Sequence, residues 1–267
     1  MAEDKNNYKI LIATPCYNGM CHAGYTLSLL RTFAYFQAAK NIKFAHKFIL
    51  FESLVPRARN HFLAYAMSDP EITHVLFIDS DMKWEPADIG KMLAANKGII
   101  GGTCPKKRYH WDKLRTEAVR EILLNDKLSQ DEFREKIKAN LVEYAINFGP
   151  SRDVKGGLIE VEHIGTAFML ISRAVIMEMM AAFPELKVKN PSNELTEEAK
   201  KHMYCLFELG VDKEGDYFSE DYSFCGRYAS LGGKIYADLS INLTHQGQED
   251  FQGNFLSLGN LKRSPRM

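Results

Sequence analysis

The chain has 267 residues, of which 46% are hydrophobic, so it is long enough for one large domain or two small ones with a substantial core. Lys plus Arg equals Asp plus Glu at 34 each, and this neutral balance supplies no global field that would attract a polyanion, although a local basic patch is compatible with it. The first ten residues are polar and acidic, unlike a signal peptide, and no later run is long enough to span a bilayer. We therefore expect a cytoplasmic protein that is not secreted.

Five cysteines are scattered along the chain, at positions 16, 21, 104, 205 and 225. An odd number without a regular spacing fits reduced thiols better than a disulfide framework. Cys16, Cys21 and His22 match no common zinc spacing and lack a fourth ligand, so buried thiols are the preferred interpretation.

Strand and helix patterns alternate through the first hundred residues. Apolar runs predict strands at 8–14, 44–51, 74–79 and 97–102, and apolar residues at helical spacing predict helices at 25–40, 55–68 and 86–95. This alternation is typical of a mostly parallel sheet that is flanked by helices, so the predicted fold class is α/β.

The second half has a different pattern. Residues 112–145 are rich in charge with spaced aliphatic residues, which indicates surface helices that form an insertion. Two short strands around Gly165 are expected after it, followed by a helix at 173–183, a helix at 219–231 ended by two glycines, and the two strands KIYAD and INLTH. Residues 184–216 show weak periodicity and predict a long, mobile loop.

The strand HVLFI ends in Asp79, Ser80 and Asp81. In an open α/β sheet, ligands bind at the carboxyl ends of the strands, so these side chains should face a pocket. Two carboxylates at alternate positions suit Mg²⁺ or Mn²⁺ that holds a diphosphate. Acidic pairs are also common at turns and helix caps, so the motif alone does not decide between the two readings.

Two further polar clusters follow the first two strands. TPCYNGM (14–20) contains Tyr17, which could stack on a base, while Thr14 and Pro15 would shape the edge of that site. ESLVPRARN (52–60) places Arg57, Arg59 and Asn60 at a helix start, where they could bind an anion or a ribose. An ordinary turn and ordinary surface arginines are the structural alternatives. No glycine-rich Rossmann or P-loop motif is present.

The C-terminal half adds a carboxylate pair and a histidine. Glu220 and Asp221 in SEDYSF open a helix, where carboxylates are favoured by the helix dipole but could also act as a general base. His245 ends the last apolar strand, as a structural residue or a further metal ligand. The basic and aromatic segment CPKKRYHW (104–111) could bind phosphate or stack on a sugar, or form a solvated turn.

Together, IATPCYNG, FIDSDMKW, IGTAFMLISR, SEDYSFCGR and LTHQG resemble, in order, the motifs of the GT-A glycosyltransferases, over roughly residues 8 to 247. SLVPRARN and IIGGTCPKK beside the aspartate motif look closest to family-2-like and Anp1-like transferases, including virus- or phage-type members that work in a bacterial or host cytoplasm. The resemblance implies one GT-A-type domain. Residues 1–103 would bind the nucleotide sugar, 104–150 would form the helical insertion, 151–250 would form the acceptor and catalytic half, and 251–267 a tail.

The resemblance also implies a role for each matching residue. Asp79, Asp81 and His245 would hold Mn²⁺ or Mg²⁺, and Asp221, with Glu220, would be catalytic; because Anp1-like relatives retain configuration, Asp221 need not be a base, and inversion or retention stays open. The donor, a UDP- or GDP-sugar, would contact Thr14, Pro15, Tyr17, Arg57, Arg59, Asn60, Asp79, Ser80 and Lys106. The acceptor would contact Trp84, Trp111, Gly165 and Thr166.

The expected activity is therefore metal-dependent transfer of a hexosyl or pentosyl group from a nucleotide diphosphate sugar to a hydroxyl of a glycan, lipid or protein. Two alternatives are kept: the same chemistry on a hydroxymethylated base of phage DNA, which the neutral net charge does not favour, and a non-catalytic module that binds sugar nucleotides or glycans.

Overall fold

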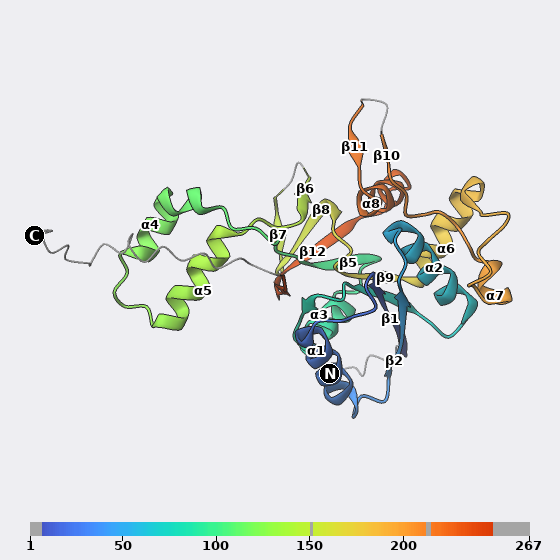
Figure 1. Ribbon diagram of the computed structural model, residues 1–267, viewed down its shortest axis with the longest axis horizontal. Coiled ribbons are helices and arrows are strands. Elements are labelled where there is room, and N and C mark those ends of the chain that lie inside the picture. Colours follow the sequence, from blue (N-terminus) through green and yellow to red (C-terminus); the bar gives the residue numbers. More distant parts are fainter. Residues whose placement is uncertain (1–6, 150–151, 212–214, 248–267) are drawn as a thin grey trace, which may run out of the picture.

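The computed structural model describes residues 7–149, 152–211 and 215–247, and its centre is a nine-stranded sheet (Figure 1). The strand order is β2-β1-β3-β9-β5-β12-β8-β6, with β7 paired to β8. The strands are β1 (Tyr8–Cys16), β2 (Ile42–Leu50), β3 (His74–Ile78), β5 (Ile99–Thr103), β6 (Ile146–Phe148), β7 (Val154–Lys155), β8 (Leu158–Ile164), β9 (Phe168–Ser172) and β12 (Ile235–Asn242). The α/β class is confirmed.

The direction of the strands follows from their connections. β1 pairs in parallel with β2 and β3, and β12 pairs in parallel with β5. β9 lies antiparallel between β3 and β5, and β8 lies antiparallel between β12 and β6. Most strands therefore point the same way and bring their carboxyl ends to one edge, which is the edge where ligands bind in sheets of this kind.

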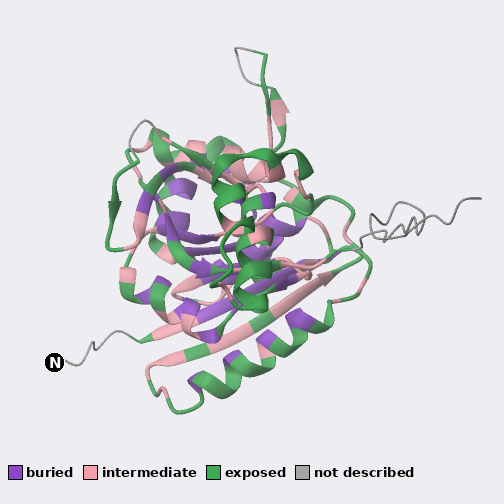
Figure 2. Ribbon diagram, turned by 90° about the vertical axis from the view of Figure 1, so that its left-hand side faces the viewer, coloured by how far each residue is buried: buried purple, intermediate pink, exposed green. Residues whose placement is uncertain are grey.

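Helices cover both faces of the sheet. One face packs against α1 (Ala23–Phe36) and α3 (Pro86–Ala95), and the other packs against α2 (Val55–Ser68), α6 (Arg173–Ala182) and α8 (Glu220–Ser230). Because both faces are covered, the four residues of β3 that follow His74 are apolar and fully buried. Figure 2 shows the buried residues gathered on the inner strands and the helix faces turned toward them.

The predicted helical insertion lies between β5 and β6. It contains the 3₁₀ helix η1 (Trp111–Arg115), α4 (Glu117–Leu123) and α5 (Gln130–Leu141), and Figure 1 shows these helices extending to one side of the sheet. α5 begins at the capping box of Ser129 and Glu132, and only Leu141 in it is buried. The insertion therefore has a small core and a large charged surface.

The segment expected to be a long mobile loop is instead packed on the domain. It contains η2 (Pro184–Leu186), α7 (Glu197–Lys200) and β10 (Gly210–Val211), which pairs with β11 (Tyr217–Phe218). Leu206 and Phe207 are buried in the main core, and Phe207 stacks on Phe224 at 4.3 Å between ring centroids. The weak periodicity arises because these side chains pack from an irregular backbone.

The two strands expected at the C-terminal end are arranged differently. KIYAD and the first residues of INLTH form one strand, β12, with an irregularity between Asp238 and Asn242. The remaining strand, β13 (Thr244–His245), pairs antiparallel with β4 (Met82–Lys83). This pairing sets His245 opposite Met82, directly after the aspartate motif. The predicted tail at 251–267 lies outside the described residues.

In the described part of the chain, no helix combines the length and the apolar character that a membrane crossing requires.

Candidate active site

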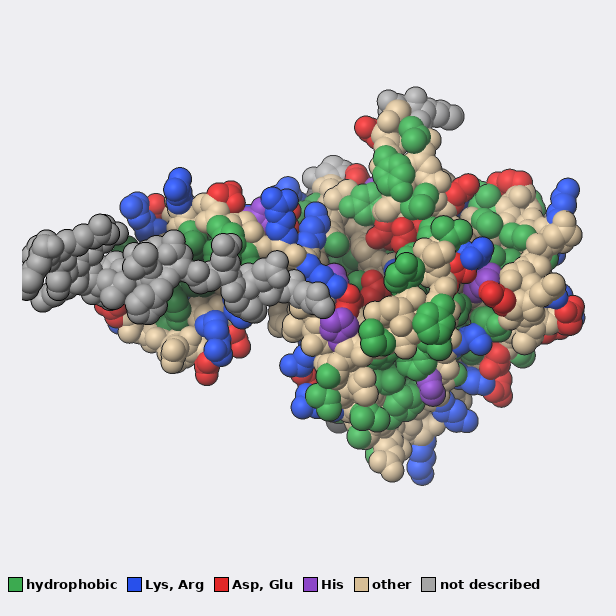
Figure 3. All heavy atoms as spheres, in the orientation of Figure 1, with side chains coloured by type: hydrophobic (Ala, Val, Ile, Leu, Met, Phe, Trp, Pro, Cys, Tyr) green, Lys and Arg blue, Asp and Glu red, His purple; other side chains and the backbone are tan. Residues whose placement is uncertain are grey.

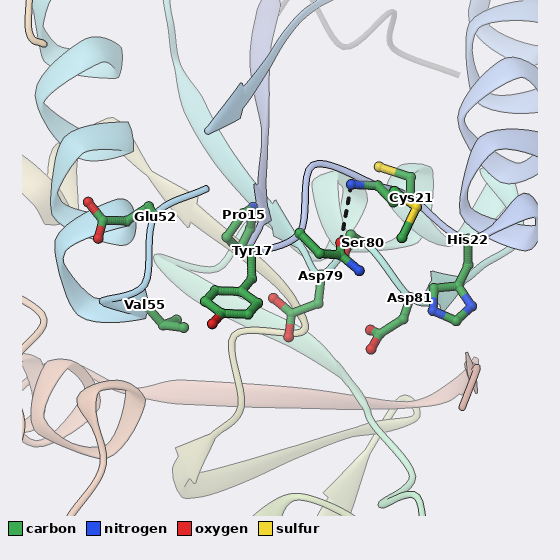
Figure 4. Close-up of a pocket in the computed structure, with 11 residues that line it drawn as sticks. Pro15, Tyr17, Cys21, His22, Glu52, Val55, Asp79, Ser80 and Asp81 are labelled. Carbon is green, nitrogen blue, oxygen red and sulfur yellow. Dashed lines mark hydrogen bonds between the residues drawn. The ribbon is translucent and has the colours of Figure 1, made fainter. Parts of the chain in front are cut away.

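A pocket of about 550 Å³ opens at the carboxyl ends of β1, β2 and β3 (Figure 4). Its lining comes from the loop after β1, the start of α2 and the aspartate motif; the residues are Pro15, Tyr17, Asn18, Met20, Cys21, His22, Glu52, Val55, Asp79, Ser80 and Asp81. Figure 4 shows Tyr17 and Asp79 side by side, with Asp81 farther along the same pocket. The volume suits a small ligand of nucleotide size.

A tight turn presents both aspartates to this pocket. The Met82 N–H donates to the Asp79 carbonyl at 3.1 Å, so the chain turns back directly after β3. The His22 N–H donates to the Ser80 carbonyl at 2.9 Å and ties the turn to the start of α1. The Gln246 N–H donates to the Asp81 carbonyl at 2.8 Å and ties it to β13. The motif is therefore fixed from two sides.

Asp79 is held by a buried arginine. The Arg59 Nη2 donates to Asp79 Oδ1 at 3.1 Å, and Arg59 Nε donates to Glu220 Oε1 at 3.4 Å. Arg59 is only 3% exposed, and among the described residues its Nη1 has no hydrogen-bond partner although it is buried. Arg59 does not line the pocket in this structure, so its unpaired nitrogen would donate to an anionic ligand only after a local movement that exposes it.

Asp81 has a different environment. It forms ion pairs with Lys107 Nζ and, at 3.4 Å between Oδ1 and Nε2, with His245. Burial acts to raise the pKa of the Asp81 carboxyl, but His245 and Lys107 outweigh it and lower the pKa to about 2. Oδ1 is buried and accepts no well-aligned hydrogen bond from the described residues, so it keeps a free lone pair.

The ring of His245 is oriented by the backbone. Its Nδ1 lies 2.8 Å from the Pro105 carbonyl oxygen, which can only accept, so Nδ1 carries the proton and donates it. Nε2 consequently faces Asp81. Burial acts to lower the pKa of His245, but Asp81 and Cys104 outweigh it and raise the pKa to about 10. In this state the imidazole is a cation beside the carboxylate.

These residues fit a divalent ion in part. Asp81 Oδ1 and His245 Nε2 converge, and a carbonyl bond to the other ring nitrogen is the usual support of a metal-ligating histidine. Asp79 is turned to Arg59 instead, and the described residues contain no group of three His, Cys, Asp or Glu side chains placed to hold a metal. A complete ligand set would need Asp79 to leave Arg59, or oxygens from a ligand.

The first turn of α8 supplies a second pair of carboxylates. Glu220 reaches Arg59, while Asp221 Oδ1 accepts hydrogen bonds from the Ser219 hydroxyl and, at 2.9 Å, from the Tyr222 N–H. Asp221 Oδ2 lies 3.5 Å from the position that a Cβ on Gly165 would occupy. The lack of a side chain at Gly165 therefore leaves room beside a carboxylate oxygen.

Trp84, Thr14 and Asn60, which were predicted to contact ligands, have side chains that are buried and bonded inside the protein. Trp84 is 1% exposed and donates from Nε1 to the Thr32 hydroxyl at 3.0 Å, so it cannot stack on an acceptor. Thr14 is buried, with its hydroxyl 2.5 Å from that of Tyr25. Asn60 is buried and clamps the backbone of Phe207 through bonds of 2.8 and 2.9 Å.

The other predicted residues fall into two places. Pro15, Tyr17 and Ser80 line the pocket with the aspartates, whereas Lys106 and Trp111 line a separate groove beside the insertion. Arg57 is half exposed and pairs with Glu52 at 2.5 Å, and Thr166 is buried beside Gly165.

Two residues near the aspartates were missed as site residues by the sequence analysis. Glu52 lies two residues after the end of β2, at the same sheet edge, which is a signal that could have identified it. Lys107 was considered only as a phosphate-binding residue, because its pairing with Asp81 depends on the path of a loop 26 residues away along the chain.

Comparison with protein-family models and with curated proteins finds no match. Among solved structures, the crystal structure of A197 from STIV is similar over 90% of this chain and 86% of that chain, at 13% identity and a TM-score of 0.42. The structure of 4-diphosphocytidyl-2C-methyl-D-erythritol synthase from Anaerococcus prevotii is similar over 84% of this chain and 99% of that chain, at 10% identity and a TM-score of 0.33. At these scores we take no residue role, substrate or activity from either protein.

Proposed function

We propose that this protein is a metal-dependent glycosyltransferase, which moves a sugar from a nucleotide diphosphate sugar to a hydroxyl group of an acceptor. The observation that carries the proposal is the pairing of Asp81 and His245 at the end of the donor-sized pocket. There a buried carboxylate oxygen with a free lone pair lies 3.4 Å from a histidine nitrogen whose ring is fixed by the backbone. A carboxylate oxygen and a backbone-oriented histidine nitrogen that converge in this way would suit a cation once the histidine Nε2 has lost its proton to make way for the metal.

Mn²⁺ or Mg²⁺ would be held by Asp81 and His245, with Asp79 joining when a ligand draws Arg59 away. When bound, the ion would stabilise the negative charge that develops on the departing diphosphate. The chain itself would contribute Arg59 Nη1 and Lys107 as donors to phosphate oxygens, and Tyr17 as a surface on which a base can stack.

In the transfer, the bond between the anomeric carbon and the diphosphate oxygen breaks, and a bond from that carbon to the acceptor oxygen forms. In an inverting reaction, Asp221 Oδ2 would accept the acceptor's hydroxyl proton, and the diphosphate would leave with the electron pair. In a retaining reaction, Asp221 would only position the acceptor.

The test is a panel of nucleotide sugars with and without Mn²⁺, scored for slow donor hydrolysis and for thermal stabilisation, with Asp81→Asn beside the natural protein. One donor should stabilise the protein and give metal-dependent turnover, and both effects should be lost in Asp81→Asn. Asp126→Asn, an exposed carboxylate on the insertion, is the matched control and should behave like the natural protein. A folded protein that responds to no donor in the presence of metal would refute the proposal, and binding of a donor without any turnover would indicate a non-catalytic module.

A further inference from the structure

We call the pocket lined by Tyr17, Asp79 and Asp81 the donor pocket, after its proposed role. A second and larger hollow lies beside it, between the insertion and the sheet. We call it the insertion groove; its volume is about 1700 Å³, and its walls are the segment from Thr103 to Lys113, helix α5, and the stretch from Leu239 to Gly247. Small-molecule sites usually measure about 300–1,000 Å³. The insertion groove is therefore large enough for a stretch of polymer.

Positive charge is concentrated in the insertion groove. Six Lys and Arg side chains line it against two Glu, although the whole chain is neutral. Exposed Lys136 and Lys138 line it from α5, and exposed Lys106 and Arg108 line it from the loop after β5. Figure 3 shows Lys and Arg side chains gathered where the insertion meets the main body. A local excess of this kind on a neutral protein is the electrostatic footprint expected of a polyanion site.

Aromatic rings are interleaved with these cations. Trp111 is 60% exposed and lies 5.4 Å from Tyr109 between ring centroids. Tyr144 and Phe148 are also exposed and line the same groove. Large rings left open to solvent among lysines do not serve the core. They are the platforms on which unpaired bases stack.

The insertion groove also reaches the candidate chemistry. Lys107 and His245 line it and at the same time bind Asp81 of the donor pocket. Tyr144 also lines the groove, and the next residue, Ala145, packs against Gly165. A Cβ placed on Gly165 would lie 3.6 Å from the Ala145 Cβ and 3.5 Å from Asp221 Oδ2. A chain lying in the groove would therefore pass Lys107 and His245, the two partners of Asp81.

We propose that the insertion groove binds a single-stranded segment of nucleic acid, with phosphates on the lysines and arginines and unpaired bases on Trp111 and Tyr109. The inference rests on the proposed function, for which it names the acceptor class. A strand is favoured over a duplex because paired bases would not be free to stack on the exposed rings.

The binding test needs neither donor nor metal, so its failure is distinguishable from failure of the transferase proposal. A fluorescent oligonucleotide of about 20 nucleotides, as DNA or RNA, is titrated by anisotropy at several salt concentrations between about 50 and 200 mM. Lys136→Glu combined with Lys138→Glu should weaken binding by about tenfold or more and reduce the salt slope by about 1 to 2, because each lost phosphate contact lowers it by about 0.7.

Trp111→Ala should weaken binding by about tenfold while leaving the salt slope unchanged, because stacking does not release counterions. The matched controls are Arg31→Glu combined with Lys40→Glu, and Tyr35→Ala, which are exposed positions on or just after α1. Both controls should bind like the natural protein.

Three outcomes would overturn the inference. The first is no binding by the natural protein at the lowest salt. The second is tighter binding to a duplex than to a strand of the same length. The third is that heparin competes as well as an unlabelled strand does and that Trp111→Ala leaves binding of the strand unchanged. This result would identify a general polyanion surface.

Discussion

At the scale of single residues, Arg59 is the side chain on which the donor pocket depends most. It is the buried cation between Asp79 and Glu220, two carboxylates from segments far apart in the sequence. Removing one partner of a buried ion pair leaves the other charge uncompensated, which costs more than the pair itself contributes.

The first prediction is that Arg59→Met lowers the free energy of unfolding by about 3 kcal/mol, the low end of the range for broken buried pairs because Asp79 keeps some contact with solvent. Urea denaturation at neutral pH measures it. Arg31→Met, exposed on α1, should change stability by less than about 0.5 kcal/mol. Equal losses in the two variants would show that the network of Arg59 is not a stabilising one.

At the scale of elements, β3 leads into the aspartate motif at one end and carries a half-buried titratable group, His74, at the other. His74 packs edge-on against Tyr8 at 5.5 Å, and burial lowers the pKa of His74 from 6.5 to about 4. Between these two values, the unfolded chain binds a proton that the folded protein does not. This contribution to stability is therefore fully present above about pH 6.5 and is lost as the pH falls toward 4.

The second prediction follows from this window. Natural protein should lose stability steeply between about pH 7 and 5, and His74→Phe, which keeps a ring against Tyr8, should lose less over the same range. Urea denaturation at a series of pH values gives the two slopes. Burial also lowers the pKa of His61 and His163, so the slope of the variant should be reduced but not abolished. Parallel curves would contradict the assignment to His74.

Helix α8, which presents Glu220 and Asp221, has one glycine inside it and another just after its end. Gly232 ends the helix with φ of +82°, and Gly226 lies inside it; neither has an atom within 4 Å of a Cβ position among the described residues. An alanine would meet no steric clash at either site, so the effects of the two substitutions on stability differ only through the backbone conformation that the alanine must adopt.

The third prediction is a pair of changes of opposite sign. Gly232→Ala should destabilise the protein by about 1 kcal/mol, because a left-handed conformation is costly for alanine. Gly226→Ala should stabilise it by about 0.5 to 1 kcal/mol, because alanine is the better helix former. Thermal unfolding of the two variants checks both, and the same sign in both would mean that the end of α8 is not where the structure places it.

At the scale of the whole molecule, the sequence was sufficient to predict those helices and strands whose signal comes from residues adjacent in the chain. The bounds of α2 and α3 agree with the predicted ranges, and β3 differs by one residue, because a continuous apolar run and a helical period are local signals. The burial of Trp84 was not predicted, because it depends on Tyr25 and Phe168, which pack against it from distant segments.

The candidate site divides in the same way. Ligands bind at the carboxyl ends of the strands in an open α/β sheet, so the sequence was sufficient to predict that Asp79 and Asp81 line a pocket. The partners that set their chemistry, Arg59 for one and Lys107 for the other, depend on packing and loop paths that no local pattern encodes. Lys107 is the more consequential partner, because it stands between the donor pocket and the insertion groove.

The fourth prediction concerns this shared lysine. In the absence of a ligand, Lys107 competes with any cation for Asp81, so Lys107→Met should tighten Mn²⁺ binding by about fivefold, equivalent to the loss of about 1 kcal/mol of ion pairing. The same change should weaken binding of a nucleoside diphosphate, because the ammonium would otherwise contact its phosphates. Calorimetric titration of the two ligands separately gives both constants, with Lys83→Met as the control because Lys83 is exposed and only two residues from Asp81.

If Lys107→Met tightens Mn²⁺ binding and weakens binding of the diphosphate, Lys107 holds Asp81 until a diphosphate arrives and then moves to the diphosphate. That movement would couple the donor pocket to the insertion groove, because Lys107 lines the groove as well. Weaker binding of both ligands would contradict this, because it would mean that the lysine only keeps the loop from Cys104 to Trp111 in place. Lys83→Met distinguishes either result from a general loss of positive charge near the pocket, since it removes the same charge without removing the contact with Asp81.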